Sequence, residues 1–169
     1  MSEWLRLMNE MKQRRPQDYF TPTQLIAYES LMERLQFPNQ RLNLYGPPGS
    51  GKTFIAWGLV KDLDAIHLPV SDRLREYDGY DMSVLVIDNA PTYEDELRGL
   101  LADAALIGAG SIIFITNRPA SLQMRRIHLD HPSNDDIRHV ARTFGRLGFY
   151  EQVTPPMSAN FWKLLQCYV

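Results

Sequence analysis

Hydrophobic and polar positions follow two different periods along the chain, and the change between them divides the sequence. Residues 4–15 carry apolar side chains at helical spacing, and residues 23–35 do the same after a Thr-Pro pair that is typical of a helix start. From residue 42 onward, short runs of consecutive apolar residues alternate with longer stretches of helical spacing. The pattern therefore predicts a helical first part, followed by a part in which strands and helices alternate.

The alternating part predicts a mostly parallel sheet with helices on both of its faces. Consecutive branched residues fill the strand candidates at 84–87 and 111–116, as in strands that are buried on both sides. Further strands are expected at 42–45, 65–70 and 127–129, and helices at 53–63, 71–77, 94–106, 134–147 and 160–168. This order of elements predicts the α/β fold class.

Length and composition indicate a globular chain. With 169 residues, of which 44% are apolar, the sequence fits one domain, or one domain with a small appendage. No apolar run approaches the ~18 residues of a membrane span, and no basic region followed by an apolar run opens the chain. We therefore expect a cytoplasmic protein without a membrane segment, and the single Cys167 cannot form an internal disulfide.

The net charge of −2 conceals an uneven distribution. Residues 42–117 carry 5 basic and 11 acidic side chains, whereas residues 118–148 carry 6 arginines and 3 aspartates. The whole chain is not basic enough to indicate nucleic-acid binding by its charge alone. The second stretch is a candidate for a local cationic patch.

The most specific motif is an octapeptide between the first expected strand and the following helix. It matches the pattern G-x-x-x-x-G-K-[ST] in the strand-to-helix context that this pattern requires. Its glycines let the backbone curl so that N–H groups point at phosphate oxygens, and the positive end of the helix faces the same anion. We expect its lysine to reach the β- and γ-phosphates of a nucleotide and its threonine to bind Mg²⁺. The residues are Gly46, Pro47, Pro48, Gly49, Ser50, Gly51, Lys52 and Thr53.

Asp88 is the expected partner of this phosphate loop. It follows the buried strand at 84–87, and an acid at the carboxyl end of a strand neighbouring the loop can hold Mg²⁺ through water. The alternative reading is an ordinary aspartate in a turn. The next residue is Asn89, where many ATPases place a glutamate. Because an amide can orient water but cannot accept its proton, Asn89 predicts slow or partner-dependent hydrolysis.

A third polar position, Asn117, follows the strand at 111–116. At the edge of the sheet its amide could hold the attacking water or sense the γ-phosphate. The alternative is an asparagine that ends a strand in a turn before Arg118-Pro119.

Together, the three elements at 46–53, 84–89 and 112–117 resemble the AAA+ ATPases, in which the matching positions are the phosphate loop, the magnesium-binding acid and the first sensor. Superfamily 3 viral helicases share a similar third motif. The resemblance covers roughly residues 40–148 and implies a P-loop NTPase.

The resemblance divides the chain into three parts. It implies a helical N-terminal extension at 1–38, a P-loop core at 39–132, and a reduced helical lid at 133–169. The amphipathic segment at 4–15 would pack on the core or dock on a partner, and the apolar segment at 161–169 would complete the core or bind a partner.

The implied function is that of an Mg²⁺-dependent, ATP-binding ATPase that acts as a nucleotide-controlled switch or loader. The family works as homo-oligomers or in complexes with a larger protein, and its compact members point to DNA replication, recombination or mobile elements, with DNA as an associated partner. An arginine finger, supplied to a neighbouring subunit from the helix after the third motif, would be Arg125 or Arg126. The alternative for both is a pair of solvated side chains at a helix end. A second-sensor arginine would have to be Arg138 or Arg142.

Two other functions are consistent with the motifs. Asn89 also suits an adaptor that binds nucleotide without hydrolysing it. A small-molecule kinase has a similar glycine-rich loop, but such kinases usually carry it at the extreme N-terminus, whereas here 45 residues precede it.

Overall fold

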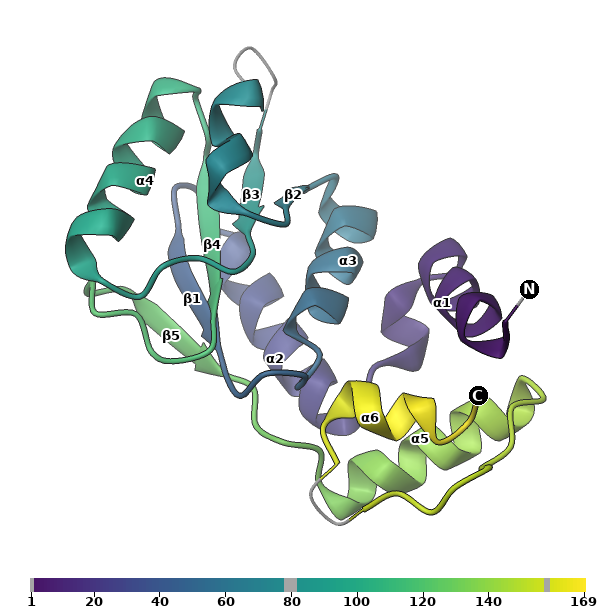
Figure 1. Ribbon diagram of the computed structural model, residues 1–169. Helices are drawn as coiled ribbons and strands as arrows, with labels where there is room; N and C mark the ends of the chain where they lie inside the picture. Colours follow the sequence, from purple (N-terminus) through teal and green to yellow (C-terminus); the bar gives the residue numbers. More distant parts are fainter. Residues whose placement is uncertain (1, 78–81, 157–158) are drawn as a thin grey trace.

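The computed structural model describes residues 2–77, 82–156 and 159–169 (Figure 1). Within these ranges, five parallel strands form one sheet in the order β2-β3-β4-β1-β5. The strands are β1 (Arg41–Tyr45), β2 (Ile66–Leu68), β3 (Val84–Ile87), β4 (Ser111–Thr116) and β5 (Arg125–His128). The expected α/β class and the parallel sheet are confirmed.

Helices lie close to where the sequence predicts them. They are α1 (Glu3–Gln13), α2 (Pro22–Leu35), α3 (Lys52–Leu63), α4 (Glu94–Leu106), α5 (Asn134–Arg146) and α6 (Phe161–Gln166), with 3₁₀ turns η1 (Pro16–Tyr19) and η2 (Ser71–Tyr77). The predicted start of α2 is confirmed, because Thr21 and Gln24 form a capping box and Pro22 occupies the first turn. None of the helices in the described ranges is long and apolar enough to cross a membrane.

The last strand differs from its prediction. It begins at Arg125 rather than at Ile127, so both arginines expected at a helix end lie in β5 instead, with exposed side chains. β5 is one of the two edge strands of the described sheet and pairs there only with β1. An edge strand needs few apolar side chains, which explains why the apolar pattern predicted the strand only from Ile127 onward and missed its first two residues.

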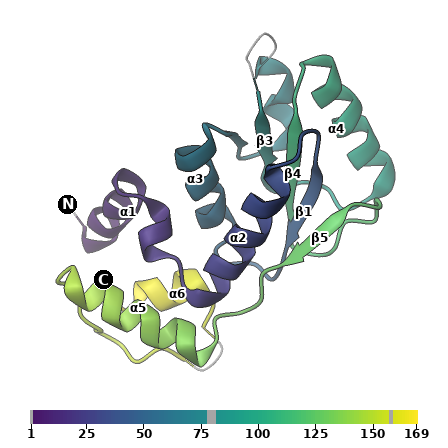
Figure 2. The ribbon, with the colours of Figure 1, turned by 180° about the vertical axis from the view of Figure 1, so that it is seen from behind.

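The two faces of the sheet are covered by different helices (Figures 1 and 2). Side chains of α2 and α3 pack on the face that carries Leu44 and Ile113. Side chains of α4 and η2 pack on the opposite face, which carries Ile112 and Phe114. The alternation follows from the pleat of a strand, whose successive side chains point to opposite faces.

The first and last helices belong to the first of these two cores. Leu7 of α1 and Phe161 of α6 are fully buried in it, and the rings of Trp4 and Trp162 lie 6.5 Å apart. Both chain ends therefore lie on the same side of the molecule (Figures 1 and 2). The amphipathic first segment and the apolar last segment both pack on the domain.

Candidate functional site

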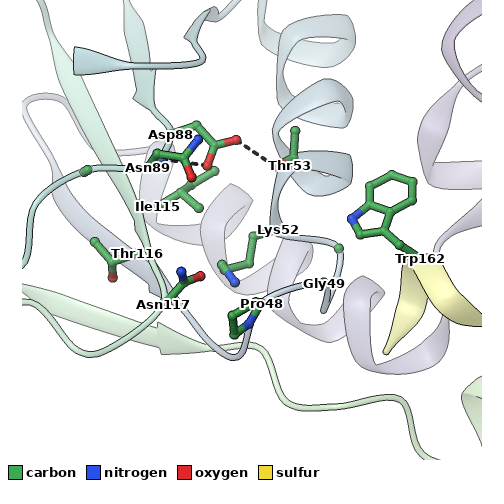
Figure 3. A pocket seen from close by; sticks show the side chains of 12 residues that line it. Pro48, Gly49, Lys52, Thr53, Asp88, Asn89, Ile115, Thr116, Asn117 and Trp162 are labelled. Carbon is green, nitrogen blue, oxygen red and sulfur yellow. Dashed lines mark hydrogen bonds between the residues drawn. The ribbon is translucent and has the colours of Figure 1, made fainter. Parts of the chain in front are cut away.

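A cavity of about 310 Å³ lies at the carboxyl edge of the sheet. It brings together residues of the phosphate loop, the ends of β3 and β4, and one residue of α6 (Figure 3). We call it the carboxyl-edge cavity. Its lining residues are Pro48, Gly49, Gly51, Lys52, Thr53, Asp88, Asn89, Ala90, Ile115, Thr116, Asn117 and Trp162.

The loop between β1 and α3 has its shape because glycine occupies its crowded positions. A Cβ atom on Gly46 would lie 1.9 Å from the carbonyl oxygen of Leu129, which is backbone and has little freedom to move. Gly51 has a φ of +98°, and a Cβ there would lie 2.2 Å from Nε2 of Gln24. That same Gln24 Nε2 donates a hydrogen bond to the Ser50 carbonyl oxygen at 3.2 Å. Helix α2 thus supports the loop from behind.

Lys52 points its ammonium group back into this loop. Its Nζ donates hydrogen bonds to the carbonyl oxygens of Gly46 at 2.7 Å and Pro47 at 2.8 Å, and the side chain of Ser50 lies 3.4 Å away. Burial lowers the pKa of Lys52 to about 8, although the nearby Asp88 carboxylate acts to raise it. At pH 7 the group remains mostly protonated, so the loop encloses a positive charge at the mouth of α3.

Hydrogen bonds and a histidine contact hold the carboxylate of Asp88 in place. Its Oδ2 accepts a hydrogen bond from Thr53 Oγ1 at 2.7 Å and lies 3.3 Å from Nε2 of His67, while Oδ1 accepts the Asn89 N–H at 2.8 Å. Burial acts to raise the pKa of Asp88, but the hydrogen bonds from His67, Thr53 and Asn89 outweigh it and hold the pKa below its ordinary value. The carboxylate is therefore ionised at neutral pH.

The position of Asp88 in the sheet corrects one expectation. Its strand, β3, is not the neighbour of β1, because β4 lies between them. Asp88 reaches the loop across the end of β4, through the hydroxyl of Thr53 on α3. The intervening strand has a consequence of its own, since its end brings Asn117 into the cavity beside Pro48 of the phosphate loop (Figure 3).

The hydroxyl of Thr53 and the carboxylate of Asp88 have the oxygen chemistry that Mg²⁺ prefers. In the described part of the chain, no group of three or more histidine, cysteine, aspartate or glutamate side chains could hold a metal. Mg²⁺ typically keeps several waters and is shared between one or two protein side chains and phosphate oxygens. The residues present therefore fit a metal that arrives with a nucleotide.

Asn89 follows Asp88 in a left-handed backbone conformation, with a φ of 49°. Its Nδ2 donates a hydrogen bond to the carbonyl oxygen of Pro69 at 3.0 Å. The side-chain amide is thus hydrogen-bonded to the backbone that follows β2.

Asn117 is exposed to the cavity, and the strand end that carries it is held by a buried side chain. Asn43 donates hydrogen bonds from Nδ2 to the Phe114 carbonyl oxygen at 3.1 Å and to Thr116 Oγ1 at 2.9 Å. Its Oδ1 accepts the N–H of Ala120 at 2.9 Å. Asn43 therefore fixes both sides of the turn in which Asn117 lies.

The four candidate arginines lie outside the carboxyl-edge cavity. Arg125 and Arg126 begin β5, whose other end, at His128, is the end nearest the cavity. Arg126 Nη2 donates to the Ala120 carbonyl oxygen at 2.6 Å. The side chains of Arg138 and Arg142 are exposed on α5.

Sequence reasoning missed three contributors to the site. Gln24 supports the loop, His67 contacts Asp88, and Trp162 lines the cavity. A signal existed for His67, because a polar residue between Ile66 and Leu68 is unusual in a strand of a sheet predicted to have helices on both of its faces. Trp162 and Gln24 come from helices far from the motifs, and nothing in their local pattern distinguishes them from ordinary packing residues.

No known protein-family model matches the chain, and no curated protein matches its sequence. What the site can do is therefore inferred from its own residues and their geometry.

Proposed function

We propose that the chain is an Mg²⁺-dependent, ATP-binding ATPase of the AAA+ kind, which acts as a nucleotide-controlled switch or loader. One observation carries the proposal. A glycine-bounded loop at the mouth of α3 encloses the ammonium group of Lys52, and the adjoining Thr53 hydroxyl is 2.7 Å from the ionised Asp88. Positive charge for phosphate and oxygen ligands for Mg²⁺ thus lie side by side.

Each residue then has a defined task. The N–H groups of the first turn of α3, which have no partner within the helix, and Lys52 would bind the phosphate oxygens. Thr53 and Asp88 would hold Mg²⁺, which supplies neutralisation of the charge on the phosphates. Asn117, at the end of β4, would orient water beside the terminal phosphate.

The proposal includes a second protein subunit, either another copy or a larger partner. Asn89 cannot accept a proton, and its amide is engaged by Pro69, so this chain by itself offers a weak environment for hydrolysis. Arg125 is exposed on the edge strand, from which it would reach a neighbouring subunit. Arg126 already donates a hydrogen bond to the Ala120 carbonyl oxygen, so Arg125 is the better candidate for the arginine finger.

DNA is the further partner in this proposal. Another cavity of about 240 Å³, between α2 and β5, is lined by three positive side chains, Arg34, Arg125 and Arg126, and by one acidic side chain, Glu33. Such a patch attracts the phosphates of a nucleic acid through a salt-dependent interaction.

The test measures binding of ATP with Mg²⁺, and its hydrolysis with and without DNA, in wild type, Lys52→Ala and Asp88→Ala. We expect turnover that rises with DNA or a partner and vanishes in both variants. Lys52→Ala should also weaken ATP binding at least tenfold, because it removes the positive charge from the loop. Absence of any MgATP or MgGTP binding by the wild type would refute the proposal.

A second candidate is an adaptor that binds nucleotide for assembly and does not hydrolyse it. The observation that favours it is the hydrogen bond from Asn89 Nδ2 to the Pro69 carbonyl oxygen, which uses one N–H of the side chain that would otherwise be available to orient water. Tight MgATP binding without release of phosphate, with or without DNA, would select this candidate over the ATPase.

A further inference from the structure

Helix α6 closes the carboxyl-edge cavity on the side away from the metal ligands. Its Trp162 is the one aromatic side chain among the described lining residues. Figure 3 shows the indole across Gly49 from Lys52, with its nitrogen-bearing edge turned toward the loop. The cavity thus has a polar side, which contains Asp88 and Asn117, and an aromatic side.

The aromatic side is attached directly to the phosphate loop. The backbone N–H of Trp162 donates to the carbonyl oxygen of Gly49 at 3.4 Å. A Cβ atom on Gly49 would lie 2.4 Å from Cγ of Asn160, so the side chain of Asn160 is packed against this glycine. Asn160 also accepts the Lys163 N–H at 2.9 Å and thereby caps α6. The first turn of α6 and the loop therefore form one unit.

Four other rings hold the indole of Trp162 in place, but none of them stacks parallel to it. Trp162 contacts the rings of Trp4, Phe54, Trp57 and Phe161, and the four interplanar angles lie between 57° and 72°. These contacts are tilted or edge-on, and the side chain stays partly exposed. A ring that is already fixed loses little conformational freedom when a ligand packs against it.

The direction of a bound nucleotide follows from the two sides of the cavity. Thr53, Asp88 and Asn117 define the end at which Mg²⁺ and the terminal phosphate belong. The other end of the nucleotide must leave the loop on the opposite side, where Trp162 lies (Figure 3).

We propose that the base of the bound nucleotide stacks on the indole ring of Trp162, which thereby forms the nucleoside-binding part of this site. The inference rests on the proposed function and names the group that recognises the part of the nucleotide beyond the phosphates. Every base has a π-face, so stacking on an aromatic side chain tolerates different bases. The site is therefore expected to bind ATP and GTP with similar affinity.

The test compares MgATP with magnesium tripolyphosphate, which has the phosphates and lacks the nucleoside. Affinities of both are measured for wild type, Trp162→Ala, Trp162→Phe and the control Trp57→Ala. Trp57 belongs to the same aromatic cluster but is absent from the lining of the carboxyl-edge cavity. Melting temperatures of all four proteins report on folding.

We expect Trp162→Ala to weaken MgATP about tenfold and to leave tripolyphosphate unchanged, because the backbone contact to Gly49 remains. Trp162→Phe should keep most of the MgATP affinity, and Trp57→Ala should change neither ligand. An equal loss of both ligands in Trp162→Ala would overturn the inference, since it would mean that Trp162 only supports the loop. Unchanged MgATP affinity in Trp162→Ala would also overturn the inference.

A second measurement keeps Trp162 in place. In the double variant Trp4→Phe/Trp57→Phe, the remaining tryptophan is Trp162. Its fluorescence should change on adding MgATP and not on adding magnesium tripolyphosphate, whereas the same response to both would contradict the inference. A wild type that binds tripolyphosphate no more weakly than MgATP would overturn the inference alone. A wild type that binds neither would overturn the proposed function as well.

Discussion

The two sides of the carboxyl-edge cavity are built in different ways. The polar side comes from residues that directly follow strands, such as Asp88 after β3 and Asn117 after β4, so the parallel sheet itself brings them together. The aromatic side comes from α6, which reaches the loop by packing of Asn160 and Trp162 on Gly49. Strand direction therefore places the first side, and tertiary packing places the second.

The largest effect is expected on the polar side, from Gly46→Ala. The new Cβ would lie 1.9 Å from the Leu129 carbonyl oxygen, and the loop would have to move away from β5 and the segment after it. We expect a loss of about 3 kcal/mol in the free energy of unfolding, together with loss of nucleotide binding. Denaturant unfolding measures the first and calorimetry the second. Gly99→Ala, on α4 with no atom within 4 Å, is the control and should be neutral or slightly stabilising.

The second-largest effect on stability is expected from Asp136→Asn, in the segment 133–169 that also carries Trp162. The buried carboxylate of Asp136 accepts hydrogen bonds from the Thr23 N–H at 2.9 Å, the Thr23 hydroxyl at 2.6 Å and the Ser133 N–H at 2.6 Å, and so joins α5 to α2. Since all of these groups are donors, an amide nitrogen there loses bonds, and we expect a cost of about 2.5 kcal/mol at pH 7.

The cost of Asp136→Asn should depend on pH in a defined direction. Burial acts to raise the pKa of Asp136, but the hydrogen bonds from Thr23 and Ser133 outweigh it and leave the pKa below its unfolded value of 3.8. The stabilisation is therefore fully present above pH 3.8 and is lost as the pH falls through the lower, folded value. Unfolding of both proteins between pH 7 and 2 should show their difference shrinking only in this acid range. The exposed Asp135→Asn is the control, and a difference that is constant with pH would contradict the assignment.

A smaller effect is expected from Asn43→Ala, a change on the polar side of the cavity. It leaves the Ala120 N–H without its partner in the core, at a cost of about 2 kcal/mol. Because Asn43 positions the turn that carries Asn117, turnover should fall more than ATP affinity. Steady-state kinetics separates the two, and an equal fall in both would mean that Asn43 acts on the whole loop.

The smallest effect comes from a test of the contact between the two sides. Gly49 has a φ of +77° and Asn160 packed against it, so Gly49→Ala introduces both strain and a collision. In an Asn160→Ala background the collision is absent, and only the left-handed strain of about 1 kcal/mol should remain. Unfolding free energies of the single and double variants should therefore be non-additive. Additive values would show that Asn160 does not press on the loop.

The comparison also explains how much of the molecule the sequence could predict. Strands such as 84–87 and 111–116 were predicted with correct bounds, because runs of branched residues are local signals. The meeting of Thr53 with Asp88 followed from strand direction, even though the intervening β4 was not foreseen. Binding of ATP and Mg²⁺ by these residues remains a prediction.

What the sequence could not predict depends on contacts between distant segments. Trp162 is separated from Gly49 by most of the chain, and its apolar surroundings indicated packing on the core or binding of a partner, but not a contact with the phosphate loop. The start of β5 at Arg125 lacked an apolar pattern because an edge strand does not need one, so only its end was predicted. In both cases the tertiary environment, rather than local propensity, decides where the side chain lies.

The order of segments along the chain affects how the protein is made. Translation proceeds from the N-terminus, so the phosphate loop leaves the ribosome well before α6 exists. A nascent chain at that stage has Gly49 without Asn160 and Trp162 against it. The cavity acquires its second side only once α6 has been synthesised, well after the phosphate loop itself.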